Sequence, residues 1–214
     1  EIKAGPLQDS HDDQQWSDDT VTDVNFRVIE WSGGGVVLLD QRVLPTEEQY
    51  VECGTWQDVA IAIKQMIVRG APAIGITAAY GVVLGARELI DGGRLLSKET
   101  LAPVFEGLGA TRPTAVNLFW ALDRMGRCVD DGRGDISTLE SLEAEAIAIH
   151  EEDRRMCAAM GDHGAELLPD GVRLLTHCNT GALATGGDGT ALAVIRSAHR
   201  AGRLAHVYAD ETRP

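Results

Sequence analysis

Basic residues are scarce in this sequence. It has 19 lysines and arginines against 33 aspartates and glutamates, which gives a formal net charge of −14 at pH 7. This excess of negative charge argues against a nucleic-acid backbone or an anionic membrane as the main partner. An anionic substrate would need a local group of arginines to bind against that background field.

Closely spaced cysteines and metal-binding spacings are absent as well. The chain has four cysteines without a C-x-x-C spacing and six histidines without an H-E-x-x-H pattern. Such thiols in a chain of this length are typical of a reduced, intracellular protein rather than a disulfide scaffold or a zinc site. We therefore expect neither a metal nor a disulfide among Cys53, Cys128, Cys157 and Cys178.

The sequence also lacks a recognisable targeting or membrane segment. Its N-terminus has no basic-then-apolar signal pattern. The longest uncharged run, residues 70–86, is shorter than the roughly 20 residues that cross a bilayer and contains Pro72. We expect this run to be a buried helix and the protein to be cytoplasmic.

The first 169 residues predict a mainly helical domain. Residues 1–20 are polar and acidic and predict a disordered leader. Apolar–polar alternation on both sides of a triple glycine predicts a β-hairpin within residues 24–43. Capping residues and helical spacing predict five helices, at residues 55–69, 72–90, 97–108, 113–125 and from 137 to 165 or 168. The capping boxes are expected to be Thr55 with Asp58 and Ser137 with Glu140, and Ser97 with Glu99 is expected to open the third helix. Gly75, Gly81 and Gly85 are expected to allow close approach of another backbone.

The last part of the chain has a different pattern. A strand at residues 172–177, a glycine-rich loop, a helix at 190–201 and a strand at 206–209 predict a βαβ unit. The predicted fold class is thus α/β: a helical N-terminal domain with a small antiparallel hairpin (residues 21–169), then the start of a Rossmann-like parallel-sheet domain (residues 170–214). Because two parallel strands cannot form a stable domain alone, we expect the chain to be part of a longer one.

Two turns could bind an anion. In residues 69–72, Arg-Gly-Ala-Pro, an arginine and a flexible glycine stand just before a helix that begins at proline. Residues 111–114, Thr-Arg-Pro-Thr, have the same arrangement around Arg112. The helix dipole, the free backbone N–H groups and the guanidinium would all favour a phosphate. The alternative for each is an ordinary helix–helix turn with a solvated arginine.

Cys178 stands where the strand gives way to the glycine-rich loop, the edge at which α/β sheets bind ligands. It could be an inert buried thiol, a nucleophile, or an acid–base group that works with a second acid. The adjacent His177 is a poor partner for it, because neighbouring strand residues point to opposite faces. The loop does not match G-x-G-x-x-G, so a dinucleotide site is only weakly supported.

Four motifs together resemble the methylthioribose-1-phosphate isomerases, in the family shared with ribose-1,5-bisphosphate isomerase and the regulatory subunits of translation initiation factor 2B. They occur in the family's order and place the resemblance over about residues 24–214. The motifs are residues 69–75 (RGAPAIG), 112–117 (RPTAVN), 176–185 (THCNTGALAT) and 211–214 (ETRP).

The resemblance implies an aldose–ketose isomerase of methionine salvage. It would convert 5-methylthioribose 1-phosphate to 5-methylthioribulose 1-phosphate without metal or cofactor, in the cytoplasm and as a homodimer. Arg69, Gly70 and Ala71 would bind the phosphate together with Arg112, and Cys178 would support the transition state. The family's catalytic aspartate, a glutamine and an Asn-Lys pair find no counterpart up to residue 214, so this chain alone is expected to be inactive. The alternatives are a ribose-1,5-bisphosphate isomerase and a non-catalytic regulatory protein.

Overall fold

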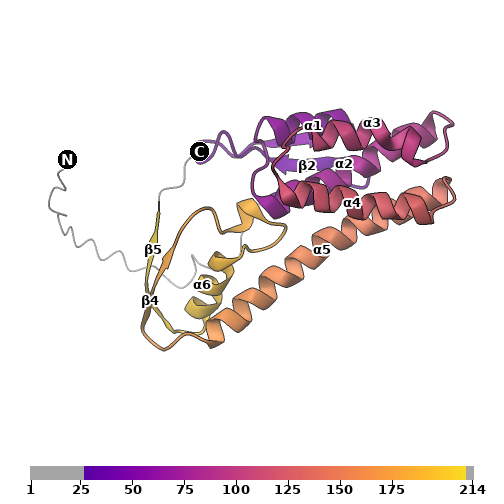
Figure 1. Cartoon of the computed structure of the whole chain (residues 1–214). Helices are drawn as coiled ribbons and strands as arrows, with labels where there is room; N and C mark the ends of the chain where they lie inside the picture. The colour runs from indigo at the N-terminus through magenta and orange to yellow at the C-terminus, as the bar shows by residue number, and fades with distance from the viewer. Residues whose placement is uncertain (1–26, 211–214) are drawn as a thin grey trace.

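The computed structural model describes residues 27–210. The predicted leader at 1–20, the start of the predicted hairpin and the motif at 211–214 lie outside these residues. The described part combines six α-helices with a three-stranded antiparallel sheet and a two-stranded parallel sheet, which confirms the predicted α/β class. Figure 1 shows α1 to α4 gathered at one end, β4, α6 and β5 at the other, and α5 running between them.

The predicted hairpin is present, and a third strand extends it. Strands β1 (Ile29–Trp31) and β2 (Val36–Leu39) pair antiparallel across the triple glycine, where Gly33 has φ 78°. Strand β3 (Tyr50–Cys53) pairs with the other edge of β2. This strand was not predicted, because four residues are too few to establish a period of two.

Helix α1 (Trp56–Lys64) begins at the predicted capping box of Thr55 and Asp58. The prediction that it continues to residue 69 is wrong. Met66 adopts φ 60°, and the Ile67 N–H bonds to the Ala62 carbonyl at 2.9 Å, which closes the helix. The chain then runs beside the end of β2, where the Gln41 N–H donates to the Ile67 carbonyl at 3.0 Å.

Helix α2 (Ala71–Asp91) is the core helix and confirms the buried helix predicted over this run. It is long and apolar enough to cross a membrane, but 83% of its most apolar 18-residue stretch is buried inside the protein. A Cβ on Gly75 would lie 2.9 Å from the Asn117 carbonyl oxygen, so another backbone does approach there. Gly81 and Gly85 instead face side chains, so the predicted backbone contact is wrong at those two positions.

Three more helices surround α2, and their starts differ from the prediction. Helix α3 (Lys98–Gly109) begins with Ser97, whose capping box partner is Thr100 rather than Glu99. Helix α4 (Val116–Asp131) begins three residues after Pro113, because the intervening residues form a turn. Helix α5 (Ile136–Glu166) is capped by Asp135, which accepts the Ser137 N–H; Ser137 is therefore inside the helix and not its cap.

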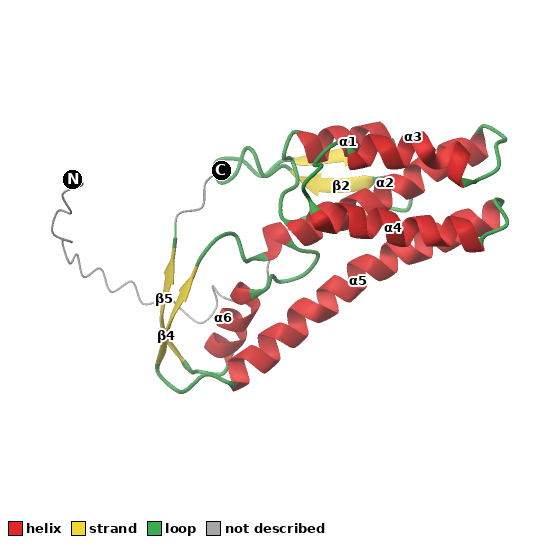
Figure 2. Ribbon diagram, viewed as in Figure 1, coloured by secondary structure: helices red, strands yellow, loops and turns green. Residues whose placement is uncertain are grey.

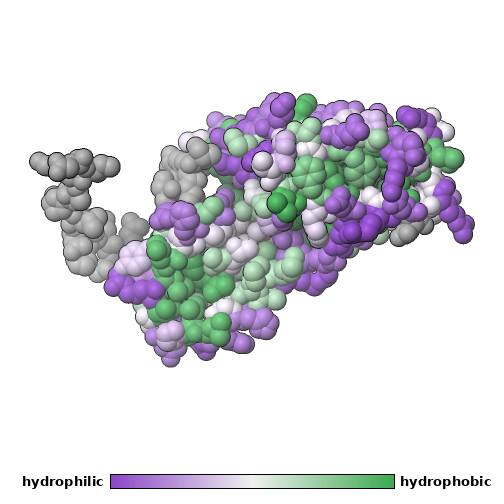
Figure 3. Space-filling model, viewed as in Figure 1, coloured by the Kyte–Doolittle hydropathy of each residue, from purple (hydrophilic) through white to green (hydrophobic). Residues whose placement is uncertain are grey.

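The predicted βαβ unit is present at the other end of α5 (Figure 2). Strand β4 (Val172–Thr176), the 3-10 turn η2 (Ala182–Ala184), helix α6 (Ala191–Arg200) and strand β5 (Leu204–Ala209) follow in order, with β4 and β5 parallel. Helix α6 packs on the last turns of α5. Apolar residues gather on the surface over β4, β5 and α6 (Figure 3). Leu175 in β4 and Tyr208 in β5 are large exposed side chains.

Candidate functional site

The N-terminus of α2 lacks the side-chain cap that α1, α3 and α5 have. Gly70 is its N-cap, with φ 94°, and no side chain bonds to the first N–H groups; the first turn also has no acidic residue. Helices α1, α3 and α5 begin instead with Thr55, Ser97 and Asp135, whose side chains accept a backbone N–H. The free N–H groups of α2 therefore remain available to an anion.

The N-terminus of α4 is uncapped in the same way and lies next to that of α2. Ala115 is its N-cap, and again neither a capping side chain nor an acidic first turn is present. Gly75, the fifth residue of α2, lies against the Asn117 carbonyl in the first turn of α4, so the two helices begin side by side. Two positive helix ends thus meet at one place, and Arg69 and Arg112 stand just before them.

Arg69 and Arg112 differ from the other partly buried arginines in their partners. The described residues contain six partly buried arginines, and four of them have a carboxylate within 4.0 Å: Arg87, Arg124, Arg196 and Arg203. Within residues 27–210, neither Arg69 nor Arg112 has such a counter-ion. A cation that is partly removed from water without a carboxylate is costly, so these two positions favour binding of an external anion.

The surroundings of Arg69 fix its position. Its Nη2 donates to the Gln41 carbonyl at 3.1 Å, and its Nε is buried without a hydrogen-bond partner among the described residues. Gln41 is itself buried, and its Nε2 donates to the Leu183 carbonyl at 2.7 Å. Residues 69–72, which we call the Arg69 turn, are therefore joined through Gln41 to the loop that follows β4.

This loop, residues 181–189, which we call the glycine loop, rests directly on Gly70. A Cβ added to Gly70 would lie 2.4 Å from the Ala184 Cα. The loop closes on itself through a bridge between Gly181 and Gly189 and the Thr190 N–H to the Thr180 carbonyl at 2.8 Å. The structure thus brings Gly70 against the glycine loop and links Arg69 to it through Gln41, although more than a hundred residues separate them in sequence. Ala71 follows as the first residue of α2 and is exposed.

Cys178 is exposed at the carboxyl end of β4, between the strand and the glycine loop. Its φ of 70° lies in the left-handed region, which a non-glycine residue occupies at a cost of about 1–3 kcal/mol. Strained positions of this kind cluster at functional sites. His177 is hydrogen-bonded to Asp210 through Nδ1 at 2.5 Å, and the Cys178 thiol makes no hydrogen bond within residues 27–210.

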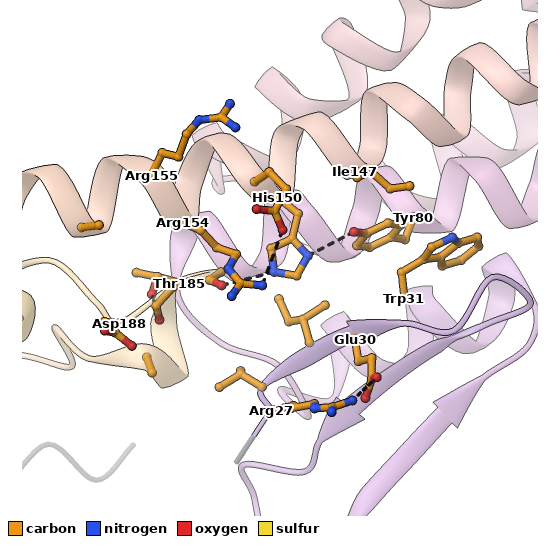
Figure 4. Close-up of a pocket in the computed structure, with 17 residues that line it drawn as sticks. Arg27, Glu30, Trp31, Tyr80, Ile147, His150, Arg154, Arg155, Thr185 and Asp188 are labelled. Carbon is orange, nitrogen blue, oxygen red and sulfur yellow. Dashed lines mark hydrogen bonds and ion pairs between the residues drawn. The ribbon is translucent and has the colours of Figure 1, made fainter. Parts of the chain in front are cut away.

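A cavity of about 880 Å³ lies on the other side of the glycine loop, between β1, α2 and α5 (Figure 4). Its wall contains the stacked rings of Trp31 and Tyr80, whose centroids are 5.0 Å apart. Arginines and carboxylates both line it, Arg27 being paired with Glu30. Because positively and negatively charged side chains both line the cavity, it has less preference for an anion than the Arg69 turn.

A buried polar cluster on α5 is part of this wall, and the sequence did not reveal it. The Tyr80 hydroxyl is 3.0 Å from His150 Nδ1, and His150 Nε2 is 3.2 Å from the Gly186 carbonyl oxygen. Burial lowers the pKa of His150, so the ring is neutral at neutral pH. The spacing of His150, Asp153 and Cys157 places them on one face of a helix, in line with Leu142, Ala146 and Ile149; this was the available signal.

Potential metal ligands do not gather at these places. Among residues 27–210, no group of three or more histidine, cysteine, aspartate or glutamate side chains is arranged to hold a metal ion. The chemistry that the described residues offer is therefore anion binding at the Arg69 turn and a thiol at the end of β4.

The methylthioribose-1-phosphate isomerase of Geobacter metallireducens is 54% identical over 193 residues, which are 89% of this chain and 56% of that enzyme. The enzyme of the same name from Thermotoga neapolitana is also 54% identical, over 88% of this chain and 54% of its own length. The chain thus spans little more than half the length of these relatives.

Solved structures show the same relationship. The 5-methylthioribose 1-phosphate isomerase of Pyrococcus horikoshii matches 94% of this chain and 56% of its own, with a TM-score of 0.79 and 38% identity. The translation initiation factor eIF-2B subunit delta of A. fulgidus matches 88% of this chain and 55% of its own, with a TM-score of 0.76 and 42% identity. The family model of the initiation factor 2 subunits matches residues 67–214. By these matches, the chain belongs to the initiation factor 2 subunit family.

Proposed function

We propose that the protein is a sugar-phosphate isomerase that converts 5-methylthioribose 1-phosphate to 5-methylthioribulose 1-phosphate in methionine salvage. The names of relatives that are 52–54% identical to this chain support this reaction. The observation that carries it is the meeting of two uncapped helix N-termini beside Arg69 and Arg112, two partly buried arginines without a carboxylate partner in the described part of the chain.

In this proposal the Arg69 turn binds the phosphate. The guanidinium groups of Arg69 and Arg112 neutralise its charge, and the backbone N–H groups of Gly70 and Ala71 donate hydrogen bonds to its oxygens. The phosphate on C1 masks the aldehyde, so the sugar ring has to be opened by an acid before hydrogen moves from C2 to C1. The reaction rearranges one molecule, so no oxidant, reductant or cofactor is consumed.

Cys178 is the chain's candidate for acid–base support of this step. It is exposed at the carboxyl end of β4 and joined to the Arg69 turn by the glycine loop, so a sugar bound through its phosphate would extend toward that edge. Because the chain spans 56% of the length of a relative named as this isomerase, we propose that the remaining part supplies the second acid. The chain alone would then hold half of the site and would not turn over.

We further propose a helical domain at residues 21–169 and the start of a Rossmann-like domain at 170–214. The parallel pairing of β4 with β5 around α6 supports the second of these.

A cytoplasmic homodimer completes the proposal. Exposed apolar side chains at the start of α4, Val116, Phe119 and Trp120, support a contact with a second copy, which light scattering of the full-length protein would test.

The reaction itself can be tested with the full-length protein. Conversion of 5-methylthioribose 1-phosphate to the ketose, followed by NMR, is the expected result. Ribose 1,5-bisphosphate should react much more slowly. Faster conversion of the bisphosphate would replace the substrate within the same reaction class, and tight binding without conversion of either would identify a regulatory protein such as the eIF-2B subunits.

Removal of either arginine should weaken substrate binding. In Arg69→Ala and Arg112→Ala we expect KM to rise about 10- to 100-fold with kcat less affected, because a charge-assisted hydrogen bond contributes roughly 1.5–3 kcal/mol. The matched control is Arg94→Ala, which removes the same charge from an exposed site just beyond the other end of α2. Steady-state kinetics of the full-length variants measures both constants. Equal KM values in all three variants would refute the phosphate assignment.

A further inference from the structure

Gly186, in the glycine loop, is bonded to α5 through both of its backbone groups. Its N–H donates to Asp153 Oδ2 at 2.6 Å, and its carbonyl accepts a hydrogen bond from His150 Nε2 at 3.2 Å. His150 and Asp153 are three residues apart and therefore share one face of α5. Two side chains from one turn of α5 thus hold the two peptide units that flank Gly186.

The packing at this contact leaves no room for adjustment. A Cβ on Gly186 would lie 2.6 Å from His150 Cδ2, and a Cβ on Gly187 would lie 3.0 Å from the Arg154 Cα. The loop backbone therefore lies directly on α5. On its other side the loop touches Gly70 through Ala184, so it is fixed between α5 and the Arg69 turn.

The hydrogen bonds determine the state of the imidazole. Because a carbonyl can only accept, His150 Nε2 must carry the hydrogen, and the neutral ring then accepts at Nδ1 from the Tyr80 hydroxyl. Both residues are buried, Tyr80 at 2% and His150 at 8% exposure. The Tyr80 hydroxyl thus donates to His150 Nδ1, and His150 Nε2 donates to the Gly186 carbonyl.

Asp153 is an unusual choice for holding a neutral amide. It is 8% exposed, and within the described residues no cation lies within salt-bridge distance; besides the Gly186 N–H, its Oδ2 is 3.8 Å from the Cys157 thiol. A buried carboxylate without a cation is destabilising, and a neutral acceptor would satisfy the same N–H at lower cost. The 2.6 Å distance to the Gly186 N–H is that of a short, strong hydrogen bond, and this bond fixes the loop.

We propose that Asp153 and His150 are positioning residues that fix Gly186 and, through the glycine loop, set Cys178 relative to the Arg69 turn. The inference deepens the proposed function and rests on it, because the position of Cys178 affects the reaction only if Cys178 takes part in it. Neither side chain is proposed to touch the substrate.

The kinetic test uses Asp153→Ala and Asp153→Asn in the full-length protein. We expect Asp153→Ala to lower kcat about 10- to 100-fold with KM within about threefold, because small misplacements of a reacting group have effects of this size. Asp153→Asn should recover most of the loss, since its amide oxygen can still accept the Gly186 N–H. An Asp153→Ala protein that folds and retains its kcat would overturn the proposal.

The matched control lies on the same helix. Thr138 is 1% exposed, and its hydroxyl accepts the buried Gly134 N–H at 2.9 Å, so Thr138→Val also removes one side-chain acceptor from a glycine N–H. We expect it to lower thermal stability while kcat is kept. If it lowers kcat as much as Asp153→Ala does, the effect is general destabilisation and the positioning role is refuted.

Amide hydrogen exchange separates this proposal from the proposed function, because it needs no turnover. Asp153→Ala should speed exchange of the peptide covering residues 181–189 at least about tenfold, and Thr138→Val should affect residues 132–136 instead. Unchanged exchange in the glycine loop would overturn the loop contact even in an active enzyme. A wild-type protein without isomerase activity but with the expected exchange would refute the proposed function and leave the loop contact standing.

Discussion

Replacement of Cys178 by serine in the full-length protein is expected to lower kcat of the isomerisation by about 10²- to 10⁴-fold, the usual contribution of a positioned acid or base. Serine keeps the size of the side chain and its ability to donate a hydrogen bond. Its hydroxyl is a far weaker acid than a thiol, so it exchanges a proton with the sugar far less readily. KM should change little, because the phosphate is held at the Arg69 turn.

The control for this experiment is Cys128→Ser, which makes the same change on α4. It should keep kcat within a few-fold of the wild type. Near-normal turnover by Cys178→Ser would refute the catalytic role of this thiol and leave it a residue of the strand end. Protection of Cys178 from alkylation by bound substrate, followed by mass spectrometry, gives an independent reading, since this thiol is exposed in the structure.

Replacement of Gly70 by alanine should destabilise the protein and weaken substrate binding together. The added Cβ would lie 2.4 Å from the Ala184 Cα and 2.5 Å from its carbonyl oxygen, so the glycine loop has to move. The φ of 94° adds conformational strain. We expect a loss of roughly 2–4 kcal/mol in the free energy of unfolding, combining strain with overpacking, and a higher KM, because Gly70 begins the phosphate-binding turn.

Gly93→Ala separates the two contributions to this loss. Gly93 has a positive φ of 72°, but a Cβ there would meet nothing within 4 Å. It should therefore lose only the conformational part, about 1 kcal/mol, and keep its KM. Urea denaturation and steady-state kinetics measure both effects. If the two variants lose the same stability and both keep KM, the contact between Gly70 and the glycine loop has no energetic importance.

Features set by neighbouring residues could be predicted from the sequence. The Thr55–Asp58 capping box and the hairpin across the triple glycine depend on residues a few positions apart, and the structure confirms them. The end of α1 could not be predicted, because it depends on Met66 taking a conformation that glycine usually provides. Strand β3 could not be predicted either, since only its pairing with β2 identifies it.

The same distinction holds for the candidate site. The Arg69 and Arg112 turns are local patterns and could be singled out from the sequence. The absence of a carboxylate beside either one among residues 27–210, and the contact of Gly70 with Ala184, arise from packing between segments far apart in the chain. His150 and Asp153 could not be singled out from the sequence, because charged neighbours such as Glu151 and Arg154 are typical of a solvated helix face.

The left-handed backbone of Cys178 also bears on how this position evolves. Glycine would relax the backbone there, and the exposed thiol adds almost nothing to the core. Selection for stability alone would therefore favour loss of the thiol. A lineage that keeps cysteine at this position does so against the thermodynamic preference of its own fold, and one released from the need for turnover is free to drift toward glycine or asparagine.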